Sequence, residues 1–161
     1  MHHHGAISTL SGMYGVDGFS LFITAVLACS VVLASLHEAE PHHEACSALL
    51  LQGGHALYVH ALAEVYSTLT GGAQGLRVGA DLAQRLLRES VLPYVKTVTL
   101  AERDLMAALA QARSRGVRGG AVYDYLQLVA ARKVGAEALV TLELKHFSAL
   151  VREGDPRIEG V

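Results

Sequence analysis

The chain has 161 residues, of which 52% are hydrophobic and 17% are charged, and its formal net charge is −2. A chain of this length and composition can bury a core of its own, which excludes an intrinsically disordered protein and predicts one domain. The small negative charge gives no general attraction to nucleic acid. No lysine or arginine precedes Arg77, so a nucleic-acid surface would have to come from the second half of the chain.

The first 22 residues do not look like part of the fold. Three histidines follow Met1 directly, and Gly- and Ser-rich text comes after them. We interpret residues 1–22 as a purification tag with a linker and place a single domain at residues 23–161. A natural flexible leader is the alternative.

Residues 18–36 contain no charged side chain, and Val26-Leu27-Ala28-Cys29 resembles a lipid-attachment box. The run is shorter than a typical membrane span, it is interrupted by serine and threonine, and it lacks flanking cations. We therefore expect no membrane anchor and a cytoplasmic protein. A buried strand over Ile23–Ala28, leading into a helix from about Val31, is the prediction. Cys29 and Cys46 are too few for a disulfide framework and are expected to be reduced.

Beyond Pro41, short apolar strands alternate with helices that end at glycines. The strands are predicted at 56–59, 96–100, 138–141 and 157–159. The helices are predicted from Pro41 to Gly53 and at 61–69, 78–89, 102–115, 122–134 and 146–151. This order predicts an α/β three-layer sandwich with a central, mainly parallel sheet, in which ligands bind beyond the carboxyl ends of the strands.

Three acidic residues interrupt apolar text near predicted strand ends or helix starts: Glu64, Asp124 and Glu143. Converging carboxylates are the hard oxygen ligands that Mg²⁺ or Mn²⁺ prefers. Each acid has a simpler interpretation by itself, since Asp124 suits a helix N-terminus and the other two suit solvent. Only their order along the chain indicates a metal site.

That order resembles the PIN-domain family, and within it the ribonuclease toxins of VapBC toxin–antitoxin modules. The resemblance covers residues 23–160 and rests on four stretches: SVVLASL…PHH, ALAEVYSTLTG, GGAVYDYLQLVAARKVGAEALVTL and KHFSAL…DPRIE. It implies a Mg²⁺- or Mn²⁺-dependent endoribonuclease that acts as a homodimer and is neutralised by a VapB-like antitoxin. Glu64 and Asp124 would hold metal, Glu143 would assist directly or through water, and Ser30 would orient water or ligand.

The chain departs from the family at the end of the first strand. The family has an Asp there, followed two residues later by a small polar residue; matching Ser30 to that residue puts Ala28 in the place of the Asp. We expect weak metal binding and little turnover as a result. Two explanations remain open: a deliberate inactivating substitution, or a naturally degenerate member that kept only an interaction role.

Residues near Asp124 suggest how RNA is held. Arg113, Arg115 and Arg118 cluster just before it and are candidates for phosphate contacts, although a helix C-terminus also favours such cations. Tyr123 is a candidate for stacking on a base, with core packing as the alternative. We interpret His146, directly before Phe147, as a packing residue.

Overall fold

A computed structural model describes residues 23–161; the proposed tag and linker at 1–22 lie outside these residues. Five strands form one sheet in the order β3-β2-β1-β4-β5, and every neighbouring pair is parallel. The strands are β1 (Ala25–Leu27), β2 (His55–Tyr58), β3 (Val95–Val98), β4 (Ala138–Val140) and β5 (Arg157–Glu159). The predicted α/β sandwich with a parallel central sheet is confirmed.

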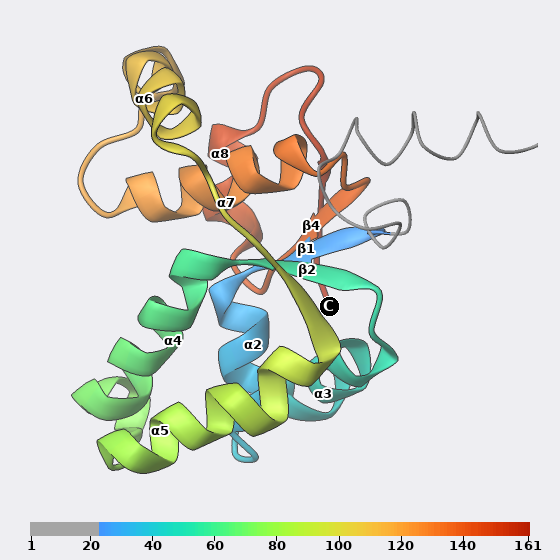
Figure 1. Ribbon diagram of the computed structural model, residues 1–161, viewed down its shortest axis with the longest axis vertical. Coiled ribbons are helices and arrows are strands. Elements are labelled where there is room, and N and C mark those ends of the chain that lie inside the picture. The colour runs from blue at the N-terminus through green and yellow to red at the C-terminus, as the bar shows by residue number, and fades with distance from the viewer. Residues whose placement is uncertain (1–22) are drawn as a thin grey trace, which may run out of the picture.

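Helices cover both faces of the sheet (Figure 1). One face carries α2 (Cys29–Leu36), α3 (His43–Gln52), α4 (Val59–Gly71) and α5 (Ala80–Leu86). The other carries α6 (Glu102–Gln111), α7 (Ala121–Lys133) and α8 (Leu144–Leu150). Successive side chains of β1 pack against helices on opposite faces of the sheet. Val26 packs in the cluster around α7, and Leu27 packs in the cluster around α2 and α4. This alternation is what a strand buried on both faces requires.

The uncharged stretch identified in the sequence forms the centre of this sandwich. Val26 and Leu27 are fully buried, and α2 begins at Cys29, two residues earlier than predicted. The Ala28 carbonyl already accepts hydrogen bonds from the amides of Val31 and Val32, at 3.1 and 3.3 Å, so the strand turns into the helix without a loop. Within residues 23–161 no helix is long and apolar enough to cross a bilayer. Both cysteines are free thiols.

Two predicted helices are interrupted near their ends. The helix predicted at 78–89 begins at Ala80 and passes into a π-helical turn, η3 (Leu87–Val91), and a 3₁₀ turn, η4 (Leu92–Tyr94), which contains Pro93. The helix predicted at 102–115 ends at Gln111 and continues as a 3₁₀ turn, η5 (Arg113–Arg115). Gly116 stops it with a φ of 71°, which favours glycine. A further 3₁₀ turn, η2 (Ala73–Gly75), follows α4.

The strand order places a reversal beside β1. The chain winds from β1 to β2 and β3 on one side, then returns to add β4 and β5 on the other. In open α/β sheets the carboxyl edge at such a reversal is where ligands bind, because helices diverge there in opposite directions. Ala28 follows β1 and Thr141 follows β4 at this edge.

Candidate functional site

Two acids and a histidine meet at this edge of the sheet. Asp124 lies in the first turn of α7, Glu143 directly precedes α8, and His146 lies in the first turn of α8. One donor atom from each of the three lies within 4.8 Å of the other two. The Nδ1 atom of His146 is 3.6 Å from Glu143 Oε2 and 3.9 Å from Asp124 Oδ2. The interpretation of His146 as a packing residue is wrong: its side chain is 65% exposed, whereas Phe147 is buried.

Glu64, on α4, joins this cluster through a buried glutamine. Gln127 lies one turn after Asp124, and its Nε2 donates to Glu64 Oε1 at 3.5 Å. The Oε1 atom of Gln127 accepts from the backbone amide of Cys29 at 3.3 Å, so one amide side chain links α4, α7 and the start of α2. The sequence carried a signal for this role, because Gln127 is the single amide in a stretch of α7 that is otherwise apolar or aromatic.

The carboxylates are close enough to perturb one another. Burial, followed by the charge of Asp124, raises the pKa of Glu64 from 4.5 to about 6, against the opposing hydrogen bond from Gln127. Burial and then the charge of Glu143 raise the pKa of Asp124, although His146 opposes the shift. No lysine or arginine of the described chain pairs with any of the three acids. The cluster therefore holds negative charge that no lysine or arginine among residues 23–161 neutralises.

The thiol of Cys29 faces the same acids. Its pKa is raised to about 12, first by burial and then by the charges of Glu64, Glu143 and Asp124. A thiol in this environment stays protonated at physiological pH, so Cys29 is not an activated nucleophile.

Ser30 holds the loop that carries Glu143. Its Oγ accepts from the amide of Leu142 at 3.1 Å and lies 3.3 Å from the hydroxyl of Thr141. That hydroxyl in turn accepts from the amide of Glu143 at 2.9 Å. These bonds join the start of α2 to the β4–α8 connection and fix the backbone at Glu143.

Ala28 occupies the end of β1 but adds no polar atom from its side chain. Its amide donates to the carbonyl of Val140 at 2.9 Å, as a strand-end residue should. The residue is 2% exposed, and it belongs to the same buried apolar cluster as Tyr58 and Leu128. The negative charge of the site thus comes from α4, α7 and the β4–α8 connection, with none from the first strand.

The predicted RNA-contact residues separate into two groups. Arg115 is mostly buried; it pairs with Asp155 at 2.5 Å, donates to the carbonyl of Leu150 and lies over the ring of Tyr125. Arg113 and Arg118 are exposed, and within residues 23–161 their side chains form no hydrogen bond or ion pair. The three arginines are neighbours in sequence, but only two of them are available to a ligand.

Tyr123 is 44% exposed beside Asp124. Its ring is stacked on that of His60, with centroids 5.0 Å apart and planes 12° from parallel. The sequence singled out Tyr123 but not His60, because His60 has no neighbouring residue at the spacing of metal ligands. The fold brings His60, on α4, against Tyr123, on α7.

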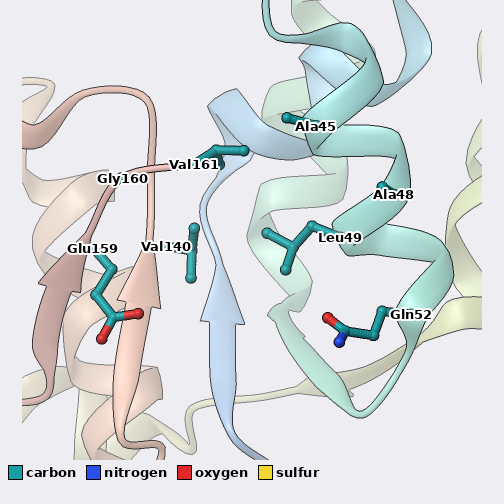
Figure 2. A pocket seen from close by; sticks show the side chains of 8 residues that line it. All are labelled: Ala45, Ala48, Leu49, Gln52, Val140, Glu159, Gly160 and Val161. Atoms are coloured by element: carbon teal, nitrogen blue, oxygen red, sulfur yellow. The ribbon is translucent and has the colours of Figure 1, made fainter.

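A separate apolar groove lies between α3 and the C-terminal residues. Figure 2 shows the side chains that line it: Ala45, Ala48, Leu49 and Gln52 from α3, with Val140, Glu159, Gly160 and Val161 opposite them. None of the predicted site residues lines this groove, and it offers one carboxylate and one amide for chemistry. It is therefore not the candidate active site.

Comparison with known proteins identifies the family of the chain. The family model of the PIN domain matches residues 28–151, which is most of the chain. The chain belongs to the PIN-domain family. Members of this family are typically metal-dependent nucleases. No curated protein sequence matches the chain.

Solved structures share the fold at low sequence identity. VapBC2 from Rickettsia felis, bound to a promoter DNA fragment, has a TM-score of 0.60 at 15% identity, over 85% of this chain and 98% of that one. VapC20 from Mycobacterium tuberculosis, a toxin that cleaves the sarcin–ricin loop, has a TM-score of 0.60 at 17% identity, over 82% and 99%. FitAcB from Neisseria gonorrhoeae has a TM-score of 0.58 at 18% identity, over 84% and 96%. The PIN domain of this chain is thus similar in fold to these three structures.

Proposed function

We propose that this chain is a divalent-metal-dependent endoribonuclease of the VapC toxin type, weakened because Ala28 replaces a carboxylate ligand. The observation that carries the proposal is the grouping of Asp124, Glu143 and His146 within 4.8 Å, at the sheet edge where the strand order reverses. Unpaired carboxylates so close together repel one another, and a divalent cation is the simplest group that would offset the repulsion.

The residues fit such a cation. Asp124 and Glu143 offer oxygen ligands and His146 offers a nitrogen, with Glu64 beside them as a further carboxylate. Carboxylates suit Mg²⁺ and Mn²⁺, whereas an imidazole adds affinity for the transition metals, so we expect Mn²⁺ to bind more tightly than Mg²⁺. When bound, the ion supplies a Lewis acid that activates water and offsets the charge of the phosphodiester.

Neighbouring side chains hold the acidic residues in position and would contact the phosphates of the RNA. Gln127 donates to Glu64 and holds its carboxylate beside the proposed cation. Ser30, through Thr141, holds the backbone that carries Glu143. We assign the phosphate contacts to Arg113 and Arg118, because Arg115 is engaged with Asp155.

The likeness in fold to solved toxin–antitoxin complexes also suggests which proteins bind this chain. VapBC2 and FitAcB are toxin–antitoxin complexes, and their folds resemble this chain. We propose that the chain forms a homodimer and that a VapB-like antitoxin neutralises it by covering the acidic site.

The proposal is tested by RNA cleavage with Mg²⁺ or Mn²⁺, comparing the chain with Ala28→Asp. Even the outer hydrogen-bond partners of metal ligands are worth about 10- to 100-fold, so a restored ligand should raise the cleavage rate at least about tenfold. Asp124→Asn in the Ala28→Asp background should abolish that gain. If Ala28→Asp folds but cleaves neither structured nor single-stranded RNA, the ribonuclease assignment is wrong.

A second function is favoured by one observation, the apolar packing of Ala28 beside a neutral glutamine link. A chain built in this way could serve as a catalytically degenerate module that binds an antitoxin. The unmodified chain and the Ala28→Asp variant would then bind a VapB-like antitoxin equally well, and neither form would hydrolyse RNA.

A further inference from the structure

Three aromatic rings lie in succession beside the acidic cluster. Tyr58 is buried at the end of β2, and its ring centroid is 6.1 Å from that of His60. His60 is half-buried in the first turn of α4 and stacks on the exposed ring of Tyr123. The rings thus lead from the core to the surface. One face of Tyr123 lies against His60, and the residue as a whole is 44% exposed.

This stack adjoins the residues proposed to hold the metal. Tyr123 directly precedes Asp124, so both lie in the first turn of α7. His60 precedes Glu64 by four residues, which places the two side chains on one face of α4, one turn apart. The nearness of the charge is also visible at Tyr58, where burial and then Glu64 raise the phenol pKa. A nucleotide whose phosphate reached the acidic cluster would have its base within reach of these rings.

We propose that His60 and Tyr123 form a stacking platform for one unpaired RNA base next to the phosphate that is cleaved. The assignment rests on the proposed ribonuclease function and adds to it the two side chains that would hold a base of the substrate. A base inside a duplex already has neighbours on both faces, whereas an unpaired base gains a partner by stacking on an exposed aromatic ring. Stacking on a tyrosine that His60 already holds in place costs little conformational entropy.

Charge near the platform favours RNA over an apolar protein segment. Arg118 lies in the loop that leads into α7, five residues before Tyr123, and its side chain is exposed and has no partner among residues 23–161. An exposed guanidinium in the loop that precedes an exposed ring supplies a phosphate contact to accompany the stacked base.

The platform is tested by RNA binding without turnover. A short single-stranded RNA carrying 2-aminopurine is titrated with the full chain in Ca²⁺ in place of Mn²⁺, and a gel confirms that the RNA stays intact. Stacking quenches 2-aminopurine fluorescence, which reports contact with a ring rather than general affinity. One base–aromatic stack corresponds to about a 5- to 100-fold change in the dissociation constant. Tyr123→Ala should lose this affinity and the quenching, Tyr123→Phe should keep both, and His60→Ala should weaken both.

Tyr66→Ala is the matched control, because Tyr66 is an exposed tyrosine of α4 that takes no part in the stack. It should bind like the unmodified chain. If Tyr123→Ala and the unmodified chain bind and quench the RNA equally, the platform is refuted and the ribonuclease proposal stands. If Tyr123→Ala instead loses only its affinity for an antitoxin, the platform serves a protein partner and the inference is again overturned. If no variant binds any RNA, the proposed function fails together with it.

Discussion

The two ends of α7 carry opposite electrostatic arrangements. At its N-terminus, Asp124 lies among other acids, and burial and Glu143 raise its pKa. Near its C-terminus, Arg132 pairs with Asp155, which Arg115 contacts from the other side. Burial opposes ionisation of Asp155, but hydrogen bonds from Arg115 and from the amide of Arg152, with the charges of Arg115 and Arg132, outweigh it and lower the pKa.

Both clusters contain half-buried or buried charge, yet only one of them is complete. Asp155 is 1% exposed, and its carboxylate oxygens are taken by two arginines and a backbone amide. In the described part of the chain, the acids at the other end have no basic side chain beside them apart from His146. The comparison teaches that the C-terminal cluster serves the fold, whereas the N-terminal cluster keeps a charge imbalance, and this is where the proposed cation would bind.

The largest effect is expected from breaking the complete cluster. Asp155→Ala would leave Arg115 buried without its partner, and removing one member of a buried ion pair lowers the free energy of unfolding by about 3–5 kcal/mol. Urea denaturation measures the loss. Because the pKa of Asp155 is lowered, its contribution is present above its ordinary value of 3.8 and is lost as the pH falls below it.

The control for this prediction is Asp104→Asn, which breaks the exposed pair between Asp104 and Lys133. Solvent screens that pair, so its loss should change stability far less. Equal losses from the two variants would show that Asp155 is not a structural centre.

The incomplete cluster should gain stability from a cation. At a free Mn²⁺ concentration about 100 times its dissociation constant, binding to the folded state alone adds about 2.7 kcal/mol to the free energy of unfolding. Calorimetric titration and thermal unfolding measure this gain, and Asp124→Asn should abolish it. Asp155 variants that remain folded should keep it, because they lie at the other end of α7. An unmodified chain with no Mn²⁺-dependent shift would contradict the metal site.

The fold could be predicted from the sequence because the spacing of hydrophobic residues and the glycines that end helices are local signals. The strand predicted at 157–159 has the observed bounds, and the helix predicted at 122–134 differs by one residue at each end. The meeting of Glu64, Asp124 and Glu143 could also be predicted, since the carboxyl ends of parallel strands share one edge.

The roles of the side chains around these three acids could not be predicted from the sequence. The lone amide of α7 marks Gln127 as unusual, but its partners Cys29 and Glu64, like the partner of His60, lie far away in sequence. His146 combines a local contact with Glu143 and a distant one with Asp124. Arg115 shows the converse: it lies between two exposed arginines in the sequence, but the fold directs it to Asp155, forty residues away.

A smaller effect of opposite sign is expected from Glu64→Gln. The ionised carboxylate destabilises the fold at pH 7, because its pKa is raised from 4.5 to about 6. Its contribution to stability is full below pH 4.5 and is lost as the pH rises through 6. The glutamine should therefore stabilise the metal-free chain by about 1 kcal/mol at pH 7, after allowance for solvent screening, and by almost nothing at about pH 4. Urea denaturation at the two pH values checks the sign, and a variant destabilised at pH 7 would contradict the raised pKa of Glu64, which burial and then the charge of Asp124 cause.

The smallest effect is expected from replacing His146, which tests whether its imidazole, in addition to the carboxylates, contributes to metal preference. His146→Gln keeps a polar side chain but removes the ring nitrogen, so it should weaken Mn²⁺ more than Mg²⁺ and reduce the preference between them by about three- to tenfold. Titrating each ion calorimetrically into the chain and the variant measures this ratio directly. His42→Gln, an exposed histidine preceding α3, is the matched control and should leave the ratio unchanged. If His146→Gln weakens Mn²⁺ and Mg²⁺ binding by the same factor, His146 does not determine the preference between the two ions. A selective loss in His146→Gln would show that the N-terminal cluster of α7 is completed by a ligand of a particular chemistry, which is what distinguishes it from the self-sufficient pair at the other end.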